Sequence, residues 1–175
     1  MSLLLDVSNL LTQYLPQITH PCDFIESIPS SNTSIILPNW TCNDFNYTVF
    51  DFSRFTNVES IEIGNDSFLS VKTFRIDGLN KLQTLKIGKK SFYIGQWVTW
   101  AHYKPYRSFS IVNCELLTSI DIGENSFSDF GGEFELRNLP SLQYLKIGEV
   151  GRESNIFFLA SLVIKGIFIS NQAEE

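Results

Sequence analysis

The chain has 175 residues, of which 43% are hydrophobic and 18% are charged, so it can bury one continuous core without support from disulfides. Its formal net charge of -6 and isoelectric point near 4.9 argue against a general binder of nucleic-acid backbones, which needs clustered Lys and Arg to release counterions. Nucleic acid is therefore not an expected partner.

The N-terminal segment 1–31 is expected to be a cap or a tail. Leu4, Leu11 and Leu15 belong to an apolar stripe at helical spacing that ends at Pro16, which predicts a helix covering the open end of the following domain. A frayed terminus is the alternative. The segment has neither a basic stretch nor a small-residue cleavage site, so the chain as written is expected to be cytoplasmic.

Two other features leave a cell-surface or secreted protein open as the alternative. Cys22 and Cys42 would pair in an oxidising compartment and remain thiols otherwise. Tripeptides of the form Asn-x-Ser/Thr accept N-linked glycans in secreted proteins, although a chain rich in these residues also contains some by chance. Four such sequons begin at Asn32, Asn39, Asn46 and Asn65.

An internal repeat fills most of the remaining chain, and its marker is Ile-Gly. The marker glycines are 24, 35 and 25 residues apart, at Gly64, Gly88, Gly123 and Gly148. Apolar residues occupy the same offsets from copy to copy, with Cys114 at one of them in the third, but the fourth copy loses the last Phe. The second copy shows the pattern as Phe74, Ile76, Leu79, Leu82, Leu85, Ile87, Gly88 and Phe92. A degenerate earlier copy is expected around Ile35 and Leu37.

Each copy predicts two short extended segments. Leu85 and Ile87 alternate with polar residues, as in a strand with one buried face, which can stack in parallel on the same strand of the next copy about 4.8 Å away. Phe74 and Ile76 predict a second segment on the opposite wall. The fold class is therefore mainly β, a solenoid over residues 32–170 with parallel strands on its inner face and short extended segments on its outer wall.

Two further columns of the repeat mark turns. Gly78, Asn113 and Asn138 share one position, and Gly and Asn tolerate a left-handed backbone. Arg54 breaks this column in the first unit. The marker glycines form the other column, where either a positive φ or a close approach between backbones would require Gly.

The repeat resembles a known superfamily. Leu117-Thr-Ser-Ile120-Asp-Ile122 and Leu142-Gln-Tyr-Leu145-Lys-Ile147 resemble the Leu-x-x-Leu-x-Leu core of leucine-rich repeats. The Ser-Phe pairs that follow three of the strands are similar to the BspA-like class of bacterial surface proteins and protists. The strands end in Gly where that class usually has Pro, and Asn125 alone stands at the usual asparagine position. The resemblance implies a leucine-rich-repeat solenoid.

An insertion at 93–108 accounts for the longer spacing between the second and third copies. Tyr, Trp and Arg are enriched at binding hot spots, and insertions in solenoids emerge on one face. A contact surface is therefore one interpretation, and a hydrophobic lid folded over the coil below is the other. The candidate contact residues are Trp97, Trp100, Tyr103 and Arg107.

The exposed side of the inner strands is the second candidate surface. Its middle column is expected to be a charge ladder that satisfies itself, reading Ile36, Glu62, Lys86, Asp121 and Lys146 from copy to copy. The flanking columns hold mostly amide and small side chains. The candidate contact residues on this face are Gln83, Lys86, Thr118 and Tyr144.

The phase of the last copy after Asn155 is open. Leu159, Leu162 and Ile164 fit an inner strand, whereas Phe157, Leu159 and Leu162 fit the outer wall 23 residues after Phe134. No polar cap follows before the tail 171–175. Either the chain is a fragment of a longer array, or the last coil is expected to meet a partner or to self-associate edge to edge.

The function expected from these features is binding rather than catalysis. Gly-x-Ser-x-Gly, His-Glu-x-x-His, phosphate-loop and Cys-x-x-Cys motifs are all absent from the sequence, so an enzyme, a cofactor and a metal site are not predicted. The apolar run from Ile156 to Ile164 is too short to cross a bilayer. The chain is expected to be a protein-interaction scaffold, or alternatively a segment of a surface or secreted adhesion protein of the BspA-like type.

Overall fold

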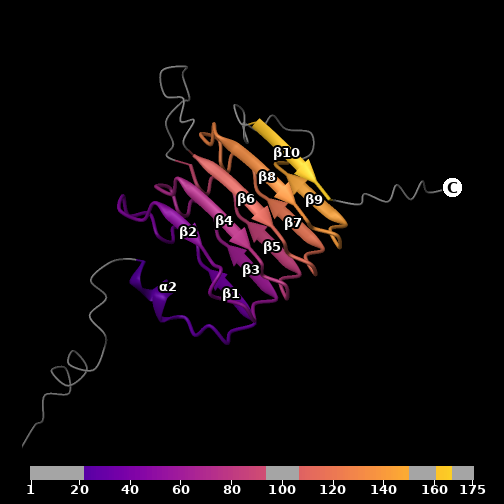
Figure 1. The fold of residues 1–175 in the computed structure, drawn as a ribbon. Coiled ribbons are helices and arrows are strands. Elements are labelled where there is room, and N and C mark those ends of the chain that lie inside the picture. The colour runs from indigo at the N-terminus through magenta and orange to yellow at the C-terminus, as the bar shows by residue number, and fades with distance from the viewer. Residues whose placement is uncertain (1–21, 94–106, 150–160, 167–175) are drawn as a thin grey trace, which may run out of the picture.

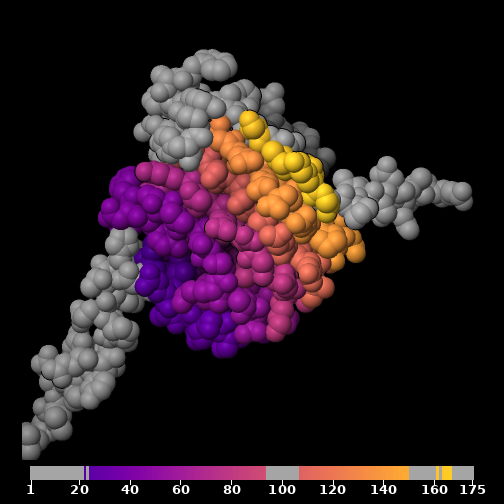
Figure 2. All heavy atoms as spheres, in the orientation of Figure 1, coloured from indigo at the N-terminus to yellow at the C-terminus, as the bar shows by residue number. Residues whose placement is uncertain are grey.

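The computed structural model describes residues 22–93, 107–149 and 161–166. Two parallel five-stranded sheets face each other across a shared core, and the chain alternates between them as it winds (Figure 1). Successive coils therefore lie side by side as bands that run in chain order from indigo to yellow (Figure 2). This is a β-solenoid, which confirms the predicted mainly β class and the parallel stacking.

Sheet A is the predicted inner face, and its order β1-β3-β5-β7-β9 skips one strand at every step. Its strands are β1 (Ser34–Leu37), β3 (Ser60–Ile63), β5 (Thr84–Ile87), β7 (Ser119–Ile122) and β9 (Tyr144–Ile147). Sheet B is the outer wall, with the order β10-β8-β6-β4-β2. Its strands are β2 (Val49–Asp51), β4 (Thr73–Asp77), β6 (Ser108–Val112), β8 (Glu133–Arg137) and β10 (Ser161–Lys165).

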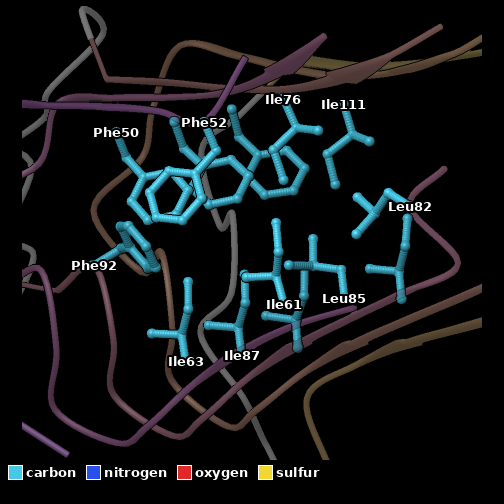
Figure 3. Close-up of a cluster of buried hydrophobic side chains, with 14 of the residues drawn as sticks. Phe50, Phe52, Ile61, Ile63, Ile76, Leu82, Leu85, Ile87, Phe92 and Ile111 are labelled. Atoms are coloured by element: carbon cyan, nitrogen blue, oxygen red, sulfur yellow. The ribbon is translucent and has the colours of Figure 1, made fainter. Parts of the chain in front are cut away.

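The core lies between the two sheets because every second residue of a strand points inward (Figure 3). The parallel register places Ile61 beside Leu85 and Leu85 beside Ile120, so like residues stack on like. Ile61, Leu85 and Ile120 are at most 1% exposed. The degenerate first coil follows the same rule, since Ile35 pairs with Ile61 in register.

Two ladders of phenylalanine rings run the length of the core. In sheet B, Phe74 is stacked between Phe50 and Phe109, with ring centroids 4.7 and 4.8 Å apart. A second ladder follows the sheet A strands, where Phe92 stacks on Phe127 at 4.5 Å. The ladders meet edge to face, as Phe74 does with Phe92 at 5.2 Å and 89°, which is a favoured geometry for aromatic rings.

The predicted left-handed turn column is confirmed. Gly78, Asn113 and Asn138 have φ angles of 70, 55 and 54°. The side chains also form a ladder, because Asn138 Nδ2 donates to Asn113 Oδ1 at 2.8 Å and Asn113 Nδ2 donates to Asp77 Oδ1 at 2.9 Å. The amides thus connect three successive coils at their corners.

A serine ladder at the opposite corner was not predicted. Ser91 Oγ accepts from Ser67 N at 3.2 Å and donates to Gly64 O at 2.8 Å. Ser126 Oγ repeats this one coil later, accepting from Ser91 N at 3.1 Å and donating to Gly88 O at 2.7 Å. Each hydroxyl therefore bonds both a donor and an acceptor of the preceding coil, which satisfies backbone groups that the buried corner removes from water.

The glycine column that marks the ends of the sheet A strands is explained by close approach of backbones. A Cβ on Gly64, Gly88 or Gly123 would lie 2.5 to 2.6 Å from atoms of the preceding coil, including Asn39 N and Gly64 C. Gly148 differs, because it has a φ of 82°. Close approach of backbones therefore accounts for Gly64, Gly88 and Gly123, and a positive φ accounts for Gly148.

A short helix, α2 (Asp23–Ser27), which the sequence did not predict, packs against the core at the N-terminal end of the stack (Figure 1). Cys22 and Ile25 are 3% and 5% exposed and belong to the core. The predicted helix over Leu4 to Leu15 lies outside the described residues.

At the C-terminal end the structure decides the phase of the last coil and corrects a core assignment. Strand β10 pairs with β8, so the last coil joins the outer wall, but Leu162 is opposite Phe134 in place of the expected Phe157. Leu145 and Ile147 were expected in the core, yet they are 39% and 41% exposed. Among the described residues, β9 is the last strand in the order of sheet A.

Candidate functional site

The outward side of sheet A is a regular polar surface. One of its columns carries hydroxyls, because Ser34, Ser60, Thr84 and Ser119 stand in register on neighbouring strands, with Tyr144 next to them on β9. Ser60 Oγ donates to Ser34 Oγ at 2.9 Å. A shallow groove of about 250 Å³ follows this column and crosses all five strands of the sheet. We call this surface the sheet A face.

The charged column beside the hydroxyls pairs with itself, as the sequence predicts. Register places Glu62 beside Lys86, Lys86 beside Asp121 and Asp121 beside Lys146. Lys86 Nζ lies 2.7 Å from Glu62 Oε1, and Lys146 Nζ lies 3.3 Å from Asp121 Oδ1. The hydrogen bond to Glu62, and then the charges of Glu62 and Asp121, raise the pKa of Lys86. Positive and negative charges therefore alternate on the sheet A face, and neither sign predominates there.

We expect Lys86→Glu to lower the free energy of unfolding by about 1 kcal/mol at low salt, because it places a third carboxylate between Glu62 and Asp121. Added salt should recover much of this loss. Denaturant unfolding at two salt concentrations measures both effects. Lys81→Glu is the control with the same charge change, since Lys81 faces an amide, that of Asn57. Equal, salt-independent losses in the two variants would contradict the ladder.

Four of the residues predicted for binding lie on this face. Lys86 and Tyr144 line the groove. Gln83 and Thr118 adjoin it at the strand entrances, where Thr118 N and Thr118 Oγ1 donate to Gln83 O at 2.9 and 3.0 Å. The fold therefore collects residues that are up to 61 positions apart, from Gln83 to Tyr144, on one surface.

The other predicted contact residues are placed differently. Trp97, Trp100 and Tyr103 lie outside the described residues. Arg107 is 1% exposed and cannot serve as a surface contact. Its Nη1 lies 3.0 and 3.1 Å from the two carboxylate oxygens of Asp129, and its guanidinium lies 5.7 Å from the centre of the Phe130 ring. Arg107 is thus placed in the interior beside a carboxylate 22 residues away in the sequence, and not on the exposed surface for which the sequence proposed it.

A second surface feature was missed by the sequence analysis. Trp40 and Phe45 are 71% and 85% exposed and, with Phe24, border an open groove of about 610 Å³ at the N-terminal end. Trp40 occupies the corner position that Asp66 and Lys90 occupy in later coils, with the same left-handed backbone. Trp40 is an aromatic residue in a column of polar ones, and this difference in the sequence could have revealed the exposed groove.

Within residues 22–93, 107–149 and 161–166, no group of three or more His, Cys, Asp or Glu is placed to hold a metal ion. In the same ranges, no helix has the length and apolar character needed to cross a membrane.

Comparison of the chain with models of protein families, with curated proteins and with solved structures found no match.

Proposed function

We propose that the chain is a protein-interaction scaffold and that the sheet A face is its contact surface. The observation that carries this proposal is the groove that crosses all five strands of sheet A and is lined mainly by aligned hydroxyl and charged side chains. Backbone ladders and stacked rings hold these groups in place. Little conformational entropy is therefore lost when a partner binds them.

The chemistry of the face indicates the kind of partner. The charges of Glu62, Lys86, Asp121 and Lys146 are paired across the strands, which leaves little attraction for a polyanion or a polycation. Hydroxyls and amides donate and accept hydrogen bonds equally well, and Tyr144, 49% exposed, adds a rigid amphipathic ring at one end. A folded protein with a mixed polar surface suits such a face. Catalysis is not part of this proposal.

We place the scaffold in the leucine-rich-repeat superfamily as part of the same proposal. Support comes from the Leu-x-x-Leu-x-Ile segments, each of which ends in a sheet A strand stacked in parallel on the next. The BspA-like class remains the narrower proposal, and it rests on the Ser-Phe pairs, whose serines and phenylalanines form the corner ladder and the ring ladder.

The test is capture of partners from native lysate, with identification by mass spectrometry. We expect Thr84→Arg combined with Ser119→Arg to reduce recovery of the specific partner at least tenfold, because two long cations fill the middle of the groove. Ser110→Arg, on the outward side of sheet B, is the matched control and should retain the partner. Circular dichroism and melting temperature show that each variant is folded.

Two outcomes would overturn the assignment of the sheet A face. The double variant could fold and still capture the same partner, or the sheet B control could lose it to the same extent. Alanine at Trp97, Trp100 and Tyr103 then tests the insertion as the recognition surface.

A segment of a surface or secreted adhesion protein is the second candidate function. The observation that favours it is that the asparagine side chains of all four sequons are exposed, at Asn32, Asn39, Asn46 and Asn65, as N-linked glycans require. A loss of mass after glycosidase treatment of the protein from its natural source would favour this function over a cytoplasmic scaffold.

A further inference from the structure

Two cysteines meet where α2 covers the N-terminal end of the solenoid. Cys22 immediately precedes the first turn of α2, and Cys42 lies at the corner after β1. Both are 3% exposed and belong to the core cluster. Burial raises the pKa of the Cys42 thiol, and its side-chain hydrogen bond with Cys22 raises that pKa further. Two thiols that are 20 positions apart in the sequence are thus neighbours in the interior.

The position of Cys42 in the repeat explains the space for this contact. Cys42 has a φ of 53° and takes the corner position that Phe68, Phe92 and Phe127 take in later coils with φ angles of 56 to 58°. Those rings fill the core and stack on each other. Replacing a ring with a thiol leaves room at the end of the ladder, and α2 brings Cys22 and Ile25 into that part of the core.

The remaining attachment of α2 to the solenoid consists of a few groups. Ile25 belongs to the buried core, and Phe24 and Ile28 pack against that core while partly buried. Arg54 Nη2 donates to the carbonyl oxygens of Ile25 and Ile28, and its guanidinium lies 4.4 Å from the centre of the Phe55 ring. This role also explains why Arg54 breaks the Gly and Asn turn column. A short helix held by so few groups gains much from a covalent link.

We infer that Cys22 and Cys42 are a disulfide site that fastens α2 to the first coil when the chain folds in the presence of a small-molecule disulfide such as oxidised glutathione. One cysteine thiolate attacks the glutathione disulfide, forms a mixed disulfide and releases one glutathione thiolate. The second cysteine then attacks the cysteine sulfur of the mixed disulfide and releases the other. The two thiol protons go to the two glutathione thiolates, and two electrons pass from the cysteine pair to glutathione.

Burial determines when this reaction takes place. The thiolate is the attacking form, and a buried thiol with a raised pKa supplies little of it. The pair therefore reacts while α2 is detached and is shielded from reductants once α2 has docked. Cys114 is an internal reference. It is 0% exposed, burial raises its pKa to about 11, and its Sγ donates to Val112 O at 3.3 Å.

The experiment refolds the reduced, denatured full chain in a glutathione redox buffer, alkylates the remaining thiols in denaturant and maps peptides without reduction. We expect Cys22 linked to Cys42, Cys114 alkylated, and an intact mass before alkylation about 2 Da below that of the reduced chain. The ring closed by the link has 21 residues. The oxidised chain should therefore melt about 6–12 °C above the reduced chain.

Variants separate the link from other causes of the melting shift. Cys114→Ser should keep both the link and the difference between oxidised and reduced melting temperatures, whereas Cys22→Ser should abolish both. Recovery of alkylated Cys22 and Cys42 after oxidative refolding would overturn the inference, as would a link from either of them to Cys114. A Cys22 to Cys42 link without a rise in melting temperature would refute the fastening role. Peptide mapping of the unsubstituted chain still tests for the Cys22 to Cys42 link if Cys22→Ser fails to fold.

Discussion

Replacing Phe74 with alanine should lower the free energy of unfolding by about 3–5 kcal/mol. The ring is 0% exposed, stacks on Phe50 and Phe109 within its own ladder, and meets Phe92 and Phe127 edge to face in the other. Its loss leaves a cavity between two coils whose backbones are fixed by parallel strands on both sides, so the site has little freedom to collapse.

Denaturant unfolding followed by circular dichroism measures this loss. The matched control is Phe45→Ala, which removes the same atoms from a side chain that is 85% exposed and should change stability by less than about 1 kcal/mol. Similar losses in the two variants would show that the ring ladders contribute no more than surface aromatic residues do.

Replacing Gly88 with valine should destabilise the chain by about 3 kcal/mol or more. Its Cβ alone would lie 2.6 Å from Gly64 C and 2.7 Å from Asn65 N. Both are backbone atoms of the preceding coil, so relief requires the coils to separate, and the serine ladder between Ser91 Oγ and Gly64 O joins them at the same corner. Thermal melting measures the effect.

Gly78→Asn is the control that separates close approach from backbone conformation. Gly78 has a φ of 70° and open space around the position of its missing Cβ, and the equivalent residues Asn113 and Asn138 already adopt this conformation. The substitution should change stability by less than about 0.5 kcal/mol. If Gly78→Asn proved as harmful as Gly88→Val, conformational freedom and not the space between coils would govern both columns.

The register of the solenoid was predictable because the repeat forces it. One Ile-Gly marker per copy sets which residues share a column, and parallel stacking then pairs Glu62 with Lys86 and Ile63 with Ile87. The physical reason is that a one-residue slip would turn every buried side chain of a strand outward. The turn column of Gly78 and Asn113 followed from backbone preference alone.

Features that depend on contacts between unlike segments were not predictable in this way. The burial of Arg107 requires Asp129, which meets it only after the coil has closed. The docking of α2 depends on the space left by Cys42 in the ring ladder. The exposure of Leu145 and Ile147 depends on which sheet the last coil joins, and two repeat phases fitted the sequence equally well.

The candidate site was predicted in part for the same reason. Gln83, Lys86, Thr118 and Tyr144 belong to regular columns, so the repeat alone brings them to one face. Trp40 and Phe45 lie in the degenerate first coil, where Phe45 is 85% exposed although the corresponding Val71 is 0% exposed. The repeat predicts which residues of a regular coil are buried or exposed. It does not predict where a terminal coil departs from that pattern.

The two ends of the stack differ within the part of the chain that the structure describes. At one end α2 packs against the first coil, where Ile35 and Leu37 are 2% exposed. At the other end Leu145 and Ile147 of β9 are 39% and 41% exposed. Head-to-tail contact between copies needs two complementary ends. The described ends are not complementary in this sense, because one offers partly exposed apolar side chains of a strand and the other offers a helix in place of a matching strand.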